Sequence, residues 1–285
     1  MGKISKIQLS VFISIIFLLG ACSSTASPKG DVKKESDLTL EEVFEKSQEA
    51  GNSLTSVHVE TSMKQTFSDN ELTGSMEMET SSSSDMILDP LTMHQTTSVN
   101  ITGEEDTSEM FELMETELYY SNQGMFMKDP LQNEWSEIPA DFIGELEDVL
   151  ATESLPQNQL EQYASRINDF TFEQDEESYI LSLQLKDEKA NEVLEEGLSV
   201  LPDELQNSMG DERDSISLNE IKINVLIDKE TFNTTTLDME MDMTMSVEGE
   251  ELQVKQQVNS TFSKFNELEE IIIPEDVLNS ATTVE

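Results

Sequence analysis

The chain has 285 residues, and 60 Asp and Glu against 16 Lys and Arg give it a formal net charge of −44 at pH 7. Such an acid excess disfavours nucleic acid and anionic membrane surfaces as partners of the folded domain. A single cysteine excludes an intramolecular disulfide, so stability must come from a packed core. Because apolar periodicity persists through most of the chain, a disordered acidic polymer is disfavoured as well.

The N-terminus has the pattern of a secretory signal peptide. Lys3 and Lys6 form a basic start, and a short apolar run follows at residues 11–19. A membrane span needs about 20 apolar residues, so this run is too short to cross a bilayer comfortably. We expect residues 1–21 to be removed.

The expected cleavage site lies before Cys22. The sequence Leu19-Gly20-Ala21-Cys22 resembles the lipobox of bacterial lipoproteins. This resemblance implies a diacylglyceryl group on the thiol of Cys22, and hence a chain anchored by lipid on the extracytoplasmic face of the cell membrane. The alternative is an ordinary signal peptide with a chance cysteine. Residues 22–37 are small and polar, and we expect them to form a flexible tether.

Residues 38–285 are assigned to a single domain, which we expect to begin with a helix over 38–50. Apolar residues recur at helical spacing from Leu40 onward. Thr39, followed by acidic residues, is typical of a helix start, and Gly51 is typical of a helix end.

The apolar period then changes from 3.6 to 2, which predicts strands. In chain order, we expect them over residues 56–67, 72–88, 91–101, 109–121, 125–128 and 134–138. Short polar turns join these segments, as in an antiparallel meander. The run Ser81–Ser84 is interpreted as a flexible or bulged stretch.

The second half of the domain mixes helices and strands. Helices are expected over 140–151, 157–167 and 188–201, and strands over 168–174, 178–187, 218–228, 237–247 and 252–265. Pro274 is expected to start a last helical turn. This order predicts an α+β fold with one large curved antiparallel sheet, whose concave face is covered by the apolar stripes of the helices.

The segment LDMEMDMTMSV, residues 237–247, places a methionine at every second position. Thioethers could bind a soft cation such as Cu(I), but no His or Cys lies nearby to support such a site. Burying four methionines would contribute about 6–12 kcal/mol, at roughly 1.5–3 kcal/mol each. We therefore expect the methionines to face inward and Asp238, Glu240 and Asp242 to face solvent.

Methionine recurs on the same face of other predicted strands, and this thioether suits surfaces that must accept varied shapes. We predict that the following side chains line a ligand site: Met63, Phe67, Met76, Met78, Met93, Met114, Leu118, Met239, Met241, Met243 and Met245. A filled core made by the same residues is the alternative.

Catalytic chemistry has little support in the sequence. His58 and His94 both fall in predicted strands and are interpreted as solvated, and no G-x-S-x-G elbow is present. The acidic residues show no spacing that defines a calcium site, so they are interpreted as a solvated exterior. Trp135 is interpreted as an anchor of the core or its rim, with a ligand platform as the alternative. We predict no enzyme activity, no metal and no cofactor.

Four segments together resemble a lipoprotein family of Gram-positive bacteria. They are LGAC at the lipobox, SVHVE after the first helix, INVLIDKETF before a long strand, and the closing IIIPEDV. The family is similar in shape to the LolA carriers and the LppX/LprG lipoproteins, which implies a half-barrel with helices over an apolar concave side. The resemblance implies binding or carriage of a lipid or other hydrophobic ligand. The alternative is an envelope lipoprotein that acts as an interaction or structural module.

Overall fold

The computed structural model describes residues 25–30, 36–69, 75–103, 114–139, 155–199, 215–247 and 250–283. The predicted signal peptide, Cys22 and the helix expected at 140–151 lie outside these ranges. None of the helices within them has both the length and the apolar character needed to cross a membrane.

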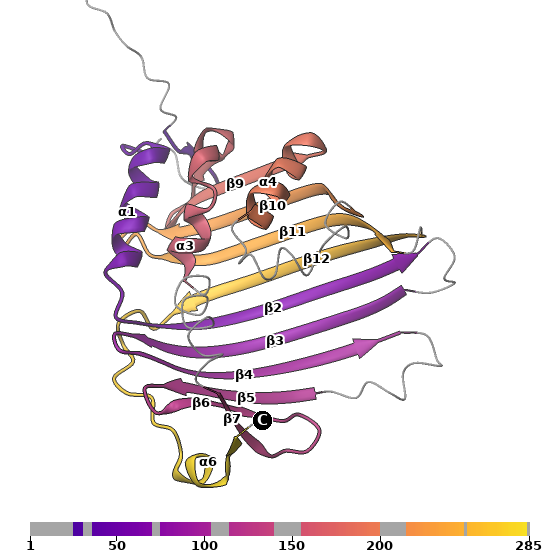
Figure 1. The fold of residues 1–285 in the computed structure, drawn as a ribbon. Coiled ribbons are helices and arrows are strands. Elements are labelled where there is room, and N and C mark those ends of the chain that lie inside the picture. Colours follow the sequence, from indigo (N-terminus) through magenta and orange to yellow (C-terminus); the bar gives the residue numbers. More distant parts are fainter. Residues whose placement is uncertain are drawn as a thin grey trace, which may run out of the picture.

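A single 13-stranded open sheet dominates the molecule (Figure 1). Its first half contains β1 (Ser27–Pro28), β2 (Ser56–Asp69), β3 (Ser75–Leu88), β4 (Leu91–Thr102), β5 (Met114–Ser121), β6 (Gly124–Lys128) and β7 (Trp135–Ile138). The second half adds β8 (Thr171–Gln174), β9 (Ser178–Lys186), β10 (Ile216–Asp228), β11 (Thr234–Val247), β12 (Glu250–Ser263) and β13 (Thr282–Thr283). The spatial order is β1-β8-β9-β10-β11-β12-β2-β3-β4-β5-β6-β7-β13.

Two antiparallel meanders build the sheet, β2 to β7 and β8 to β12, and both agree with the predicted strands. The pairing of β12 with β2 joins them. At the two edges, however, β1 and β13 pair in parallel with β8 and β7. The sheet is therefore mixed, and the prediction of a wholly antiparallel sheet is wrong at its edges. Short strands of this kind cover hydrogen-bonding groups that an open edge would expose.

The segment around β1 also differs from the expected tether. Thr25 forms an antiparallel bridge with Thr39, Ala26 is fully buried, and the amide of Lys29 donates to the carbonyl of Gln174 over 2.8 Å. Because small residues fit closely against the sheet edge, a sequence that lacks large apolar side chains can still be fixed there. The flexible-tether prediction is thus wrong for residues 25–30.

The run Ser81–Ser84 is regular strand rather than a bulge. It lies in the middle of β3 and pairs residue by residue with both β2 and β4. Strand preference depends strongly on context, and two neighbouring strands satisfy the backbone of this run completely.

Five helical segments are described: α1 (Leu40–Asn52), α3 (Pro156–Glu161), the 3-10 helix η1 (Ala164–Asp169), α4 (Glu188–Ser199) and α6 (Glu275–Ser280). At the start of α1, the Thr39 hydroxyl accepts from the amide of Glu42 over 3.2 Å, and the Glu42 carboxylate accepts from the amide of Thr39 over 2.9 Å. This reciprocal capping box confirms the predicted helix start.

Two apolar cores lie on opposite faces of the sheet. The larger one lies between the sheet and α1, α3 and α4, and its central members are at most 2% exposed: Leu40, Val43, Leu160, Leu181, Ile221, Ile223, Val225 and Leu237. The smaller one joins Tyr119 and Phe126 to Ile273 and Val277, under α6. The helices do not all cover the same face of the sheet. The strands β5 and β6 carry apolar side chains on both faces, and α6 covers the face opposite to α1, α3 and α4.

Gly51 has a different role from the predicted helix end. It lies inside α1, whose C-cap is Ser53, and a Cβ atom at Gly51 would lie 2.5 Å from the Cβ of Gln157 on α3. Gln157 is buried, and its Nε2 donates to the carbonyl of Gly51 over 3.2 Å. The glycine therefore permits the close approach of the two helices.

We expect Gly51→Ala to lower the free energy of unfolding by about 1 kcal/mol. Alanine stabilises a helix by about 1 kcal/mol relative to glycine, but overpacking against Gln157 costs about 1–3 kcal/mol. The clash therefore outweighs the helix preference, and the net effect is destabilising. Chemical denaturation measures the effect. The double variant Gly51→Ala/Gln157→Ala should lose less than the sum of the two single losses. A Gly51→Ala protein more stable than the parent would mean that Gln157 moves aside freely.

Candidate functional site

Every residue predicted to line a ligand site lies on the same face of the sheet. This inner face is the one that carries the larger core, with Val57, Met86 and Ile223 on it. Strand pairing places Met63 opposite Val258, and Met239 opposite both Val258 and Ile223. The alternation of residues 237–247 therefore predicted their faces correctly.

The described helices cover the inner face at one end only. Figure 1 shows α1, α3 and α4 over the β9–β11 part of the sheet, far from α6. Under this cover Leu181, Leu183 and Ile223 are buried, and Met239, Met241 and Met243 are half-buried against them. This end of the face is a filled core.

Toward β5 the inner face changes character. Met63, Phe67, Met78 and Met114 are half-buried, and Met76 is 43% exposed. Met93 differs from them, because it is 2% exposed and belongs to the larger core. The predicted lining residues thus divide into packed core members and partly accessible ones.

A polar band crosses this inner face and was missed at the sequence level. Its members lie directly opposite one another on five adjacent strands: Ser260, Thr61, Ser82, Thr97 and Thr116. The hydroxyls of Thr61 and Ser260 are 3.2 Å apart, and Gln65 Nε2 donates to Gln256 Oε1 over 2.8 Å in a parallel row. The sequence does contain a signal for this band. Thr61 and Gln65 are an even number of residues from Val57 and Met63, so all four share one face of the strand. The inner face is therefore amphipathic.

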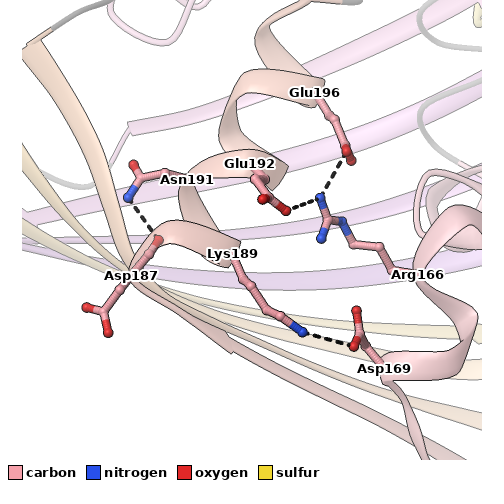
Figure 2. Close-up of polar contacts among 7 residues, drawn as sticks. All are labelled: Arg166, Asp169, Asp187, Lys189, Asn191, Glu192 and Glu196. Carbon is pink, nitrogen blue, oxygen red and sulfur yellow. Dashed lines mark hydrogen bonds and ion pairs between the residues drawn. The ribbon is translucent and has the colours of Figure 1, made fainter.

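Ion pairs join α4 to η1 on the helical side of the sheet (Figure 2). Arg166 of η1 donates from Nη2 to Glu192 over 3.1 Å and to Glu196 over 2.9 Å, both on α4. The hydrogen bond to Glu196 is the main cause that raises the pKa of Arg166. A second bond runs from Lys189 Nζ to Asp169 over 3.2 Å. These contacts fix α4 to η1 above the apolar face.

The two histidines lie on the opposite, outer face of the sheet. They were predicted to be solvated, but both side chains are partly buried and lie next to a carboxylate. The side chain of His58 is 14% exposed, and its Nδ1 lies 2.6 Å from Asp85 Oδ1. His94 Nε2 lies 2.9 Å from Glu117 Oε1, and its ring stacks on Tyr119 at 4.3 Å. The described residues contain no group of three or more His, Cys, Asp or Glu that could hold a metal ion.

Trp135 anchors the smaller core, in agreement with one of its two predicted roles. It is half-buried, and its ring lies 5.7 Å from that of Tyr119. Burial, with the hydrogen bond to Glu117, raises the pKa of Tyr119 to about 12. The phenol therefore stays neutral at pH values where a solvated tyrosine would ionise.

This shift predicts a loss of stability at alkaline pH. The unfolded chain ionises Tyr119 near pH 10.0, whereas the folded protein does so near pH 12. The stabilisation is thus complete below pH 10 and is lost as the pH rises from 10 to 12. Chemical denaturation at several pH values between 9 and 12 measures this effect. The free energy of unfolding should fall less steeply with pH for Tyr119→Phe than for the parent. Equal slopes would contradict a role for Tyr119.

A model of the family of unknown function DUF6612 matches residues 39–282. The chain belongs to the DUF6612 family. The match begins at the N-cap of α1 and ends in β13, so it includes both described cores of this DUF6612 chain except for Ala26. No curated protein matches the DUF6612 chain in sequence.

Two solved structures are similar to this DUF6612 protein. A DUF1329 family protein from Desulfovibrio piger has 7% identity and a TM-score of 0.22, over 83% of this chain and 95% of its own. A β-barrel-like protein of the domain of unknown function DUF1849 from Brucella abortus has 9% identity and a TM-score of 0.16, over 74% of this chain and 98% of its own.

Proposed function

We propose that this protein is a lipid-anchored lipoprotein on the extracytoplasmic face of a cell membrane. Its LolA-like half-barrel would bind a lipid or another hydrophobic ligand on the inner face of the sheet. The observation that carries the proposal is the row of partly accessible apolar side chains between β11 and β5. An exposed apolar surface of this kind on a soluble domain marks an interaction site.

The chemistry of the inner face favours an adaptable, amphiphilic guest. Methionine side chains are unbranched and polarizable, so they can follow different acyl chains. The Ser/Thr band crosses between apolar rows and offers hydroxyls to a polar group of the same ligand. A purely apolar ligand would displace water from those hydroxyls without replacing its hydrogen bonds, and this costs free energy.

The N-terminal segment supports a domain held close to the bilayer. Thr25 is already paired with Thr39, so only Ser23 and Ser24 lie between the proposed anchor at Cys22 and Thr25. The three residue steps from Cys22 to Thr25 span at most about 10 Å. With lipid on Cys22, the β8 edge and α1 would lie near the membrane surface, where an acyl ligand could be exchanged.

A paired substitution tests the ligand site. Met63→Glu puts a carboxylate on the inner face, and Ser62→Glu puts the same group on the outer face one residue away. We expect Met63→Glu to weaken binding of a fluorescent fatty acid about ten-fold or more, because a charge must be desolvated. Ser62→Glu should bind like the parent.

The measurement uses the mature chain with Cys22→Ser, so that no attached acyl group competes. Native mass spectrometry after organic extraction gives a second readout of bound lipid, and the mass of the parent from membranes shows whether Cys22 is acylated. A protein that never carries or takes up lipid would overturn the binding proposal, and it would favour the interaction module. The tight packing under α1, α3 and α4 is the observation that supports this second candidate.

A further inference from the structure

The outer face of the sheet carries a hollow of about 700 Å³ over β12, β2, β3, β4 and β5. It lies on the side opposite to the methionines, since Glu60, Ser83 and Thr96 alternate out of phase with the core residues of their strands. A second hollow of about 540 Å³ lies over β8 to β12, and Asn259 lines both. We call the larger hollow the hydroxyl trough.

Hydroxyl groups form the floor of this trough. Ser81 lies opposite Ser98, and Ser83 lies opposite Thr96, on the central strands β3 and β4. None of these four side chains hydrogen-bonds to another side chain within the described part of the protein. Each hydroxyl can both donate and accept, so the floor matches a ligand that is itself rich in hydroxyls.

Carboxylates stand on both sides of the floor. Glu60 rises from β2, and Glu115 and Glu117 rise from β5. These strands are three strand spacings apart, about 14 Å. Among the described lining residues Lys128 is the one basic side chain, so this part of the trough has a net negative charge and favours a cationic occupant.

The sheet edges argue against a peptide strand as the occupant. A peptide binds a sheet best by adding to an edge, where main-chain groups are free. The trough lies in the middle of the sheet, where β12, β2, β3 and β4 are already paired on both sides, so it offers side chains rather than free main-chain groups. An aromatic ring stands in line with the trough, because Trp135 lies opposite Lys128 and is half-buried.

We propose that the hydroxyl trough binds a cationic oligosaccharide, a chain of sugars with free amino groups. The ring hydroxyls would bond to the Ser and Thr floor, and the ammonium groups would pair with Glu60, Glu115 and Glu117. The second hollow, which shares Asn259 with the trough, gives room for further sugar units. This site is on the opposite face from the proposed lipid site and does not depend on it.

Calorimetric titration of the full chain in 150 mM salt tests the proposal. The probe is a glucosamine tetramer, and its fully N-acetylated form is the uncharged comparison. The amine form should bind about ten-fold or more tightly than the acetylated form, since charged hydrogen bonds are lost on acetylation. Equal binding of the two, or no binding of the amine form, would overturn the proposal.

Matched variants separate the trough from general attraction to an acidic protein. Thr96→Val removes a floor hydroxyl and Glu115→Gln removes a wall charge, and each should weaken binding about five-fold or more. Thr80→Val makes the same change on the inner face, outside the lining of the trough, and Glu49→Gln removes a charge from the exposed side of α1. These two controls should bind like the parent. If all four variants bind equally, or if tetralysine binds as tightly as the sugar, the trough is not the site.

Discussion

Ile223→Asp should abolish cooperative folding of the domain. Ile223 is 1% exposed and lies between Leu183 on β9 and Met239 on β11. Loss of the apolar side chain costs about 2–5 kcal/mol, and an unpaired buried polar group costs about 2–7 kcal/mol more. The sum approaches the whole stability of a typical domain, about 5–15 kcal/mol.

The next residue provides the control. Asn224 lies on the outer face, and its Oδ1 accepts a hydrogen bond from the Ser182 hydroxyl over 2.9 Å. In Asn224→Asp a carboxylate oxygen can accept the same bond, so we expect a change below about 1 kcal/mol. Circular dichroism during urea denaturation compares the two variants. Equal losses would mean that β10 does not have one buried and one solvated face.

The strand that contains Ile223 illustrates what the sequence could predict. Its apolar residues alternate with polar ones, and successive side chains of a strand point to opposite faces, so both the strand and its buried face follow from the pattern. The same geometry placed Met239 and Met63 on one face although they are far apart in the chain. The capping box at Thr39 and Glu42 was equally readable, because it is purely local.

The pairing of β12 with β2 could not be read from alternation, since it joins segments almost 200 residues apart. Periodicity gives the face of a strand but not its neighbour. The parallel edge strands β1 and β13 are two residues long and carry no period at all. The position of α6 on the outer face depends on Tyr119 and Phe126, whose side of the sheet is clear only once their strands are paired.

For the candidate site, the sequence predicted the face but not its accessibility. Met93 and Met76 have the same pattern, yet one is 2% exposed and the other 43%. Exposure depends on which distant segments pack over a given row of the sheet, and this is a long-range property. The hydroxyl trough was hidden for a different reason: the run Ser81–Ser84 looks like a flexible segment until strands on both sides complete its pairing.

The ion-pair junction between η1 and α4 gives the second large prediction. We expect Arg166→Met to lower the free energy of unfolding by about 2 kcal/mol. The side chain of Arg166 is 12% exposed and bonds two carboxylates, and charge-assisted hydrogen bonds contribute about 1.5–3 kcal/mol. Its removal also leaves Glu192 and Glu196 one helical turn apart with like charges, a further cost of about 0.2–0.5 kcal/mol.

Two effects reduce the stability that Arg166→Met is expected to lose. Glu192 and Glu196 are 54% and 57% exposed, so water screens their attraction to Arg166 and solvates them when the partner is gone. Methionine also keeps an apolar stem of similar length at this position. Lys189→Met is the matched control on the same helix pair: Lys189 is 60% exposed, and loss of its bond to Asp169 should cost less than about 0.5 kcal/mol.

Hydrogen exchange should show α4 opening in Arg166→Met but not in Lys189→Met, because Arg166 ties that helix to η1 above the apolar face (Figure 2). If both variants exchange alike, α4 is held by its contacts with β9 and β10, which include two hydrogen bonds between Asn191 and the backbone of Leu218, and not by Arg166.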